Sequence, residues 1–311
     1  MQQVLTGFAT IWIVVAVGWV LAQCRIVNQA AQELLIRVAF YAAMPCQLFV
    51  TLSQADLRRI FSTNVLVSIL AIAIAALTYL AIAGPALHRQ AGHLVIGAFG
   101  ASYVNAINMG LPIAAYVLGD TSWVAPILLI QVVFLQPAGL SALDVLHARQ
   151  GGNHGSWIRN LTLPFRNPMT VGTLGGLLIN FLGWRLPEVI ANPLTVLGGM
   201  AVPAMLVAFG ASLRLGPLPV MSGAGEPLLT SVIKLVVQPM AALLLARFVF
   251  RLDAAATLAV TIMAGLPTAQ NVFMFATRYR ESVQLARDVV LITTLGSIVT
   301  LMGWAGLVHA L

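Results

Sequence analysis

The chain has 311 residues, of which 60% are hydrophobic and only 8% are charged. Soluble globular domains carry about 25% charged residues, so this composition excludes a soluble enzyme, a secreted domain and a disordered chain. The net charge of +7 therefore does not indicate a nucleic-acid partner. We interpret the basic residues as topology signals in a protein surrounded by the lipid bilayer.

Ten apolar stretches are long enough to be membrane helices, which need about 20 mostly apolar residues. They cover roughly residues 4–23, 31–52, 64–84, 93–117, 122–143, 168–183, 194–213, 227–249, 254–277 and 284–308. Helices are expected rather than strands because a chain in lipid must satisfy its backbone polar groups internally. The sequence therefore predicts an all-α membrane protein with ten transmembrane helices.

The basic residues divide unevenly between the two sets of loops that ten helices would create. The richer set contains Arg25, Arg89, Arg149, Arg159, Arg166, Arg214, Arg278, Arg280 and Arg287, with Arg37 just inside the second helix. The poorer set contains Arg58, Arg59, Arg185, Arg247 and Arg251. The richer set is expected to face the cytoplasm, and both termini would then be extracytoplasmic.

Proline landmarks indicate an internal repeat. Gly110-Leu111-Pro112 in the fourth stretch matches Gly265-Leu266-Pro267 in the ninth, with an offset of 155 residues between the prolines, and Pro45 matches Pro203 with an offset of 158. Two matches at nearly one offset predict a duplicated five-helix unit, which is inverted because five is odd, as in many secondary transporters. The units would be residues 1–143 and 168–311, joined by a cytoplasmic loop, 144–167.

The two Gly-Leu-Pro motifs predict interrupted helices at mid-membrane. Proline removes a helical hydrogen bond, and lipid tolerates unpaired backbone groups only where protein or a water-filled cavity covers them. Matched interruptions in two inverted halves point to a substrate site, where helix N-termini suit anions. The alternative is that glycine and proline only kink these helices for packing. The candidate substrate-binding residues are Asn105, Asn108, Gly110, Pro112, Gly265, Pro267, Gln270 and Asn271.

The polar side chains that flank the two motifs are amides, which offer hydrogen-bond donors and acceptors without net charge. Any of them could instead only bridge neighbouring helices. Such bridging is the better interpretation for five other polar residues: Ser102, Gln47, Gln131, Gln136 and Gln238. All nine carboxylates fall in loops or near helix ends, which argues against an acidic coupling site, although carbonyls and amides could still bind sodium.

Lys234 is the only basic residue well inside an expected helix. Three interpretations stay open: it could snorkel to the interface, pair with Glu226, or face the cavity and attract anions.

Two motifs resemble those of the auxin efflux carrier family. "NAINMGLP" (Asn105–Pro112) is similar to its N-x-x-x-M-G-[IL]-P stretch, and "LPTAQNVFMFATRY" (Leu266–Tyr279) to its L-P-x6-F-x-F-A-x-x-Y stretch. The resemblance implies a bile-acid-transporter-like elevator fold. Helices one, two, six and seven would form a scaffold, and helices three to five and eight to ten a mobile transport domain. It also implies a small carboxylate substrate, with Asn105 as the substrate-contacting asparagine, and a homodimer through the scaffold.

Two departures favour a bacterial, malonate-transporter-like member in the inner membrane over a plant auxin carrier. Val272 stands where plant proteins often carry a second proline, and the loop 144–167 is short. The leading hypothesis is a secondary transporter of a small mono- or dicarboxylate, driven by the membrane potential or a substrate gradient. A channel, a transporter-derived sensor and a membrane-embedded enzyme are the alternatives. No HExxH, GxSxG or paired intramembrane aspartate supports an enzyme, and no metal or cofactor is expected.

Overall fold

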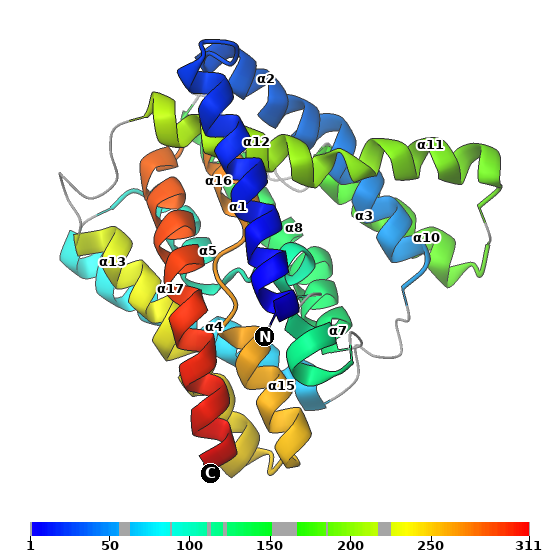
Figure 1. Ribbon diagram of the computed structural model, residues 1–311. Helices are drawn as coiled ribbons and strands as arrows, with labels where there is room; N and C mark the ends of the chain where they lie inside the picture. Colours follow the sequence, from blue (N-terminus) through cyan, green and yellow to red (C-terminus); the bar gives the residue numbers. More distant parts are fainter. Residues whose placement is uncertain are drawn as a thin grey trace.

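The computed structural model describes residues 2–55, 63–87, 89–110, 113–120, 123–150, 167–184, 186–216 and 225–310. These residues form an all-helical protein (Figure 1). Six of its helices are long and apolar enough to cross a membrane, and four shorter apolar helices accompany them. Each of the ten overlaps one expected stretch. Because four are shorter than a bilayer requires, the count of ten spans stays a prediction.

Seven segments pack against one another and form what we call the flank bundle. They are α1 (Gln2–Gln23), α2 (Gln29–Val38), the π-helical turn η1 (Ala39–Ala43), α3 (Met44–Ser53), α10 (Pro168–Phe181), α11 (Glu188–Gly199) and α12 (Ala201–Leu215). Segments α2, η1 and α3 follow one another without a gap. Only Met200 separates α11 from α12.

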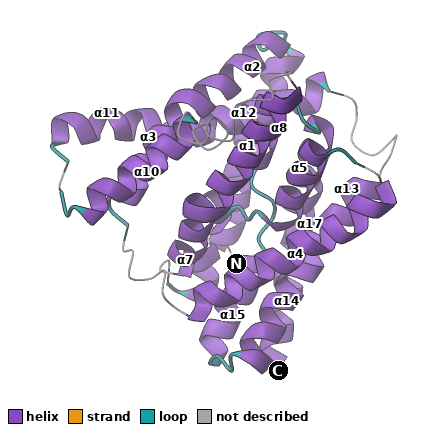
Figure 2. Ribbon diagram, turned by 180° about the vertical axis from the view of Figure 1, so that it is seen from behind, coloured by secondary structure: helices purple, strands orange, loops and turns teal. Residues whose placement is uncertain are grey.

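The remaining segments pack mainly among themselves and form what we call the crossing bundle. They are α4 (Thr63–Leu87), α5 (Ala91–Ser102), η3 (Ala106–Gly110), η4 (Ala114–Leu118), α7 (Val124–Leu129), η6 (Ile130–Leu135), α8 (Gln136–Gln150), α13 (Gly225–Val232), η8 (Ile233–Val237), α14 (Gln238–Leu244), η9 (Leu245–Val249), α15 (Ala254–Ala264), α16 (Gln270–Tyr279) and α17 (Val283–Ala310). Figure 2 shows loop segments in the middle of the molecule, among helices.

Glycines let the flank helices approach closely. A Cβ on Gly210 of α12 would lie within 1.9 Å of the carbonyl oxygen of Val15 in α1. A Cβ on Gly176 of α10 would lie 2.6 Å from the carbonyl oxygen of Phe49 in α3. Small residues at such positions allow backbones to pack tightly where lipid supplies no hydrophobic driving force between helices.

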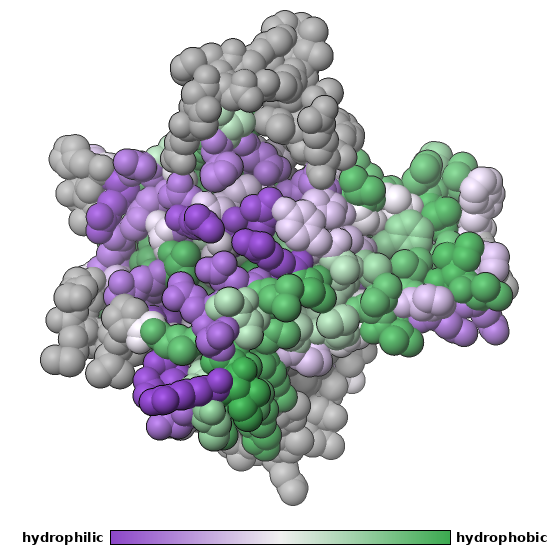
Figure 3. All heavy atoms as spheres, turned by 90° about the horizontal axis from the view of Figure 1, so that it is seen from above, coloured by the Kyte–Doolittle hydropathy of each residue, from purple (hydrophilic) through white to green (hydrophobic). Residues whose placement is uncertain are grey.

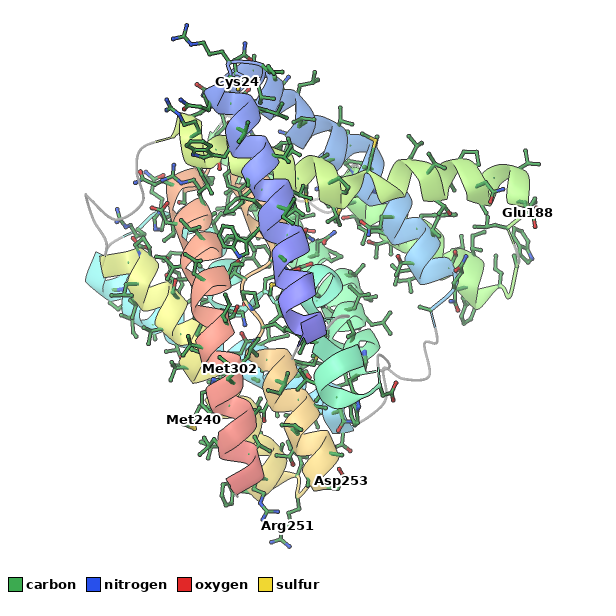
Figure 4. The ribbon with its side chains drawn as sticks, in the orientation of Figure 1. Cys24, Glu188, Met240, Arg251, Asp253 and Met302 are labelled. Atoms are coloured by element: carbon green, nitrogen blue, oxygen red, sulfur yellow. The ribbon has the colours of Figure 1, made fainter. Side chains whose placement is uncertain are left out.

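The two ends of the molecule differ in charge. Cys24, which precedes Arg25, lies at the opposite end from Arg251 (Figure 4). Seen from the Cys24 end, hydrophilic side chains gather toward the middle and hydrophobic side chains cover the flank on which α10 and α11 protrude (Figure 3). We call the Cys24 end the arginine-rich end. Arg25 and Arg214 lie there at the ends of α1 and α12, and four more arginines line a cavity beside the last residues of α12: Arg37, Arg278, Arg280 and Arg287.

Candidate functional site

Two helices are interrupted in the interior of the crossing bundle. The first ends with α5 at Ser102 and resumes at Ala106, and the second ends with α15 at Ala264 and resumes with α16 at Gln270. The extended residues between them pair antiparallel at Val104 and Thr268. The amide of Asn105 donates to the carbonyl of Pro267 at 2.9 Å, and the amide of Ala269 donates to that of Tyr103 at 3.2 Å.

The second interruption contains its Gly-Leu-Pro motif, but the first does not. The expected break at Gly110–Pro112 lies instead at Tyr103–Asn105 as far as the structure describes it, since Leu111 and Pro112 lie outside the described residues. Gly110 is part of η3, with its amide donating to the Asn105 carbonyl at 3.0 Å. The physical reason is that residues 103–105 exchange helical bonds for bonds to residues 267–269. Proline is therefore not needed to interrupt the first helix.

Side chains satisfy the backbone of the crossing segments. The Gln131 amide binds both polar groups of Val104: its Oε1 accepts from the Val104 amide at 2.6 Å and its Nε2 donates to the carbonyl at 3.0 Å. The Thr268 amide donates to Thr293 Oγ1 at 3.1 Å, and Thr268 Oγ1 donates to the Gly100 carbonyl at 2.6 Å. An unpaired buried amide or carbonyl costs about 1–3 kcal/mol, so these bonds hold the crossing together.

The structure brings three of the predicted amides to the crossing. Asn105 and Gln270 are both 2% exposed, and Asn105 Nδ2 donates to Gln270 Oε1 at 2.9 Å. Asn271 follows in the first turn of α16. Asn108 lies in η3, and its side chain lies outside the described part of the structure.

The predicted glycine and proline residues take different places. Gly265 caps the C-terminus of α15, where its amide donates to the Thr261 carbonyl. The carbonyl of Pro267 accepts the bond from Asn105. A Cβ on Gly110 would lie 3.2 Å from the Leu266 side chain, so the two Gly-Leu-Pro motifs lie close to each other although their positions in the two interruptions differ.

A small cavity of about 20 Å³ lies at the crossing, between the two bundles. Asn105, Gln131 and Asn271 line it from the crossing bundle, and Gln47 lines it from α3 of the flank bundle. Such a volume accommodates about one water molecule. A carboxylate would therefore enter only if the bundles moved apart.

Gln47 is the residue whose role the sequence analysis missed. Its Oε1 is buried and has no hydrogen-bond partner among the described residues. A buried polar atom without a partner is rare and calls for an explanation. The signal in the sequence was its place two residues after Pro45, one of the repeat landmarks.

The N-terminus of α16 also borders this cavity. Its N-cap, Ala269, makes no side-chain capping bond, and Ala269 and Asn271 both line the cavity. The first amides of a helix have no intrahelical acceptor and carry partial positive charge. The small cavity therefore combines neutral amide donors with the end of a helix that favours an anion.

Lys234 lies elsewhere in the crossing bundle, and among the described residues it neither reaches the interface nor pairs with Glu226. It is fully buried, and its ammonium donates to Gln238 Oε1 at 2.7 Å and to the Ala264 carbonyl at 2.8 Å. Glu226 instead binds Tyr79, Arg89 and His93. Lys234 lines neither the small cavity nor the larger one described below.

No group of three or more histidine, cysteine, aspartate and glutamate side chains that could hold a metal ion is found among the described residues. The polar chemistry at the crossing is that of amides, hydroxyls and backbone groups, which can bind and release a solute. It includes no nucleophile paired with a base in the described part of the small cavity's lining.

Comparison with known proteins identifies the family. A family model described as "Membrane transport protein" matches residues 3–140 and 157–305. A protein of Rhizobium meliloti described as "Putative malonate transporter" is 29% identical over 219 residues, which are 68% of this chain and 66% of that protein. An uncharacterized transporter of Methanocaldococcus jannaschii is 22% identical over 308 residues, covering 94% of this chain and 95% of the relative.

These matches confirm the resemblance drawn from the two motifs, and they indicate a multi-pass membrane transporter rather than an enzyme. The chain belongs to the membrane transport protein family, the family of the auxin efflux carriers.

Proposed function

We propose that the protein is a secondary transporter of a small organic anion, a mono- or dicarboxylate, with malonate as the first candidate. The observation that carries the proposal is the small cavity at the crossing, where Asn105, Asn271 and Gln47 meet the uncapped N-terminus of α16. Neutral amides and helix amides can bind a carboxylate without a permanent countercharge. The description of the Rhizobium meliloti relative supports malonate within this class.

The two bundles suit an alternating-access mechanism of the elevator type. The flank bundle would be the scaffold, and the crossing bundle would carry the substrate with three helices from each of the two inverted five-helix repeats. The small cavity is lined from both bundles, so sliding one bundle along the other would open it to alternate sides. The membrane potential contributes about 2.3 kcal/mol per charge per 100 mV and would drive export of the anion, while uptake would need a substrate gradient.

Reconstituted flux tests this function. Purified protein in liposomes should show saturable uptake of radiolabelled malonate, and Asn105→Ala should abolish it while the variant remains folded. Asn28→Ser is the matched control, because Asn28 caps the exposed start of α2 and serine preserves the cap. Non-saturable flux would indicate a channel, binding without flux would indicate a sensor, and wild-type flux in Asn105→Ala would overturn the site.

The arginine-rich end would face the cytoplasm of a bacterial cell, with both termini outside the inner membrane. Cys24 is exposed at this end, next to Arg25. A membrane-impermeant maleimide should therefore label Cys24 only after intact cells are permeabilised. Labelling in intact cells would reverse the orientation.

A homodimer through the flank bundle is the remaining part of the proposal. Helices α10 and α11 protrude (Figure 1) and expose Phe181 and Val189 at 85% each and Val196 at 76%. Either lipid or a second copy would cover these side chains. The mass of the detergent-solubilised protein, measured by light scattering, distinguishes the two, and Val196→Arg should dissociate a dimer.

A further inference from the structure

A second, much larger cavity opens at the arginine-rich end, and we call it the vestibule. Its volume is about 870 Å³. Arg37 and Tyr41 line it from the flank bundle, and Phe273, Thr277 and Arg278 line it from α16 of the crossing bundle. The vestibule thus has walls from both bundles, as the small cavity does.

Four arginines and one glutamate are the charged residues that line the vestibule: Arg37, Arg278, Arg280, Arg287 and Glu33. Two of the arginines have acidic partners. Arg37 lies 3.8 Å from Glu33, and the buried Arg287 lies 2.8 Å from Asp288. Arg278 interacts with Asp144, but that carboxylate does not line the vestibule, so Arg278 and Arg280 supply the positive charge that faces a solute there.

Aromatic rings hold the guanidinium of Arg278 in place. Its Cζ lies 5.1 Å from the ring centre of Tyr41, 5.4 Å from that of Phe40 and 5.6 Å from that of Tyr279. A guanidinium within about 6 Å of an aromatic face is attracted to it. Two of these rings belong to the flank bundle and one to α16, so the side chain is positioned before any ligand arrives.

Arg278 still has hydrogen-bonding capacity. Its Nε is buried and has no hydrogen-bond partner among the described residues. It interacts electrostatically with Asp144, but that carboxylate already accepts from the Tyr279 hydroxyl at 2.7 Å and from Asn167 Nδ2 at 3.3 Å. A planar guanidinium with unused donors is suited to bidentate binding of a carboxylate.

One helix joins the vestibule to the small cavity. Asn271, which lines the small cavity, and Arg278 are seven residues apart on α16. Seven residues are about two helical turns, so the two side chains lie on the same face about 10 Å apart. Met274 and Phe275, which lie between them in the sequence of α16, are buried and line neither cavity.

We infer that Arg278 forms a second anion-binding site, which captures a small carboxylate in the vestibule before it reaches the crossing. The inference rests on the proposed transport of a carboxylate. The same chemistry would also suit the phosphate headgroup of an anionic lipid, so the experiment includes both ligands. Arg280 contributes to the positive field of the vestibule but has no comparable aromatic cage.

Malonate-induced thermal stabilisation in lipid-free detergent tests the inference in four proteins: wild type, Asn105→Ala, Arg278→Gln and the double variant. Asn105→Ala should retain a weaker stabilisation that declines as salt is raised, and adding Arg278→Gln should remove it. Arg278→Gln alone should raise the apparent Kd for malonate about tenfold. Arg278→Lys should restore only part of the lost affinity, because a lysine ammonium cannot bind a carboxylate bidentately. Arg25→Gln is the control at the same end, outside the vestibule lining.

The two proposals fail in different ways. Equal stabilisation of Asn105→Ala and the double variant would overturn the Arg278 site and leave the crossing site intact. Unchanged malonate affinity in Asn105→Ala would overturn the crossing site. In that case a raised apparent Kd in Arg278→Gln would support the vestibule site, and an unchanged one would overturn it. Stabilisation by phosphatidylglycerol but not by malonate, if lost in Arg278→Gln, would make Arg278 a lipid site and overturn the inference. Absence of any malonate effect on wild type would overturn both.

Discussion

The side chains of Lys234 and Gln238, one helical turn apart, bind the C-terminal ends of both interrupted helices. The Lys234 ammonium binds the carbonyl of Ala264, the last residue of α15, and Gln238 Oε1, while Gln238 Nε2 donates at 3.1 Å to the carbonyl of Ser102, the last residue of α5. Helix C-termini carry partial negative charge. Lys234 thus supplies hydrogen-bond donors where two such ends meet.

Lys234→Met should destabilise the protein. It removes the ammonium donor from the Ala264 carbonyl and the Gln238 oxygen, at about 1–3 kcal/mol for each buried group left unpaired. The melting temperature in detergent should fall by several degrees, and flux should fall with it. Arg247→Met is the matched control, because Arg247 is a basic residue outside the interior of the crossing. A more stable Lys234→Met variant would show that burying the charge costs more than its bonds contribute.

Flux should be independent of sodium. The side chains of Lys234 and Gln238 already bind the carbonyls at the two helix ends where a coupling cation would be attracted, and no acidic side chain among the described residues lines the small cavity. Replacing external sodium with N-methylglucamine should leave the initial rate of malonate uptake in proteoliposomes unchanged. A rate that rises saturably with sodium would contradict this reading of Lys234.

Gln131 should be essential for the fold of the crossing rather than for ligand binding alone. Gln131→Ala leaves the Val104 amide unpaired and removes one of the two bonds to the Val104 carbonyl, which also accepts from the Ala106 amide at 2.9 Å, at a cost of about 1–3 kcal/mol. Thermal unfolding should show a marked loss of stability, whereas Gln54→Ala, at an exposed position after α3, should have almost no effect. Equal melting temperatures for the two variants would mean that water or a shifted backbone replaces the Gln131 bonds.

The sequence predicted which residues meet at the crossing better than it predicted what they do there. Asn105 and Gln270 were identified because they flank the motifs and offer hydrogen-bond donors and acceptors without net charge, and in the structure they bond to each other. The interruption at residues 103–105 was not predicted, because a strand-like pairing with residues 267–269 opens this helix without proline and joins segments about 160 residues apart. The geometry of Lys234 depends likewise on a carbonyl 30 residues away.

The length of the apolar stretches predicted an all-helical fold, because lipid leaves few alternatives for an apolar segment. The residue pattern could not show that Gln47, which looks like any amide in a membrane helix, lacks a partner for its Oε1. That property depends on how α3 packs against the other bundle. The vestibule depends similarly on arginines from α2, α16 and α17.

Gly210→Ala should separate α1 from α12, because the new Cβ would lie 1.9 Å from the Val15 carbonyl oxygen, which a rigid helix backbone cannot withdraw. We expect a large drop in melting temperature. Gly303→Ala is the control, since nothing lies within 4 Å of its Cβ position on α17, and alanine should stabilise that helix by about 0.5–1 kcal/mol. Equal stability of the two variants would contradict the tight α1–α12 contact.

Gln47→Leu should raise stability and lower affinity at the same time. Leucine removes a buried oxygen that has no partner among the described residues, and replacing an unpaired polar group by an apolar one of similar size is neutral or stabilising. The same change removes an amide donor from the small cavity, so malonate KM should rise about tenfold, corresponding to one lost hydrogen bond to a charged group. The melting temperature without ligand and the KM in proteoliposomes measure the two effects separately. If Gln47 served only to bridge helices, the variant would lose stability and keep its KM. If it contacts substrate, the two quantities move in opposite directions, and Gln47→Asn, which keeps the amide on a shorter side chain, should restore part of the affinity.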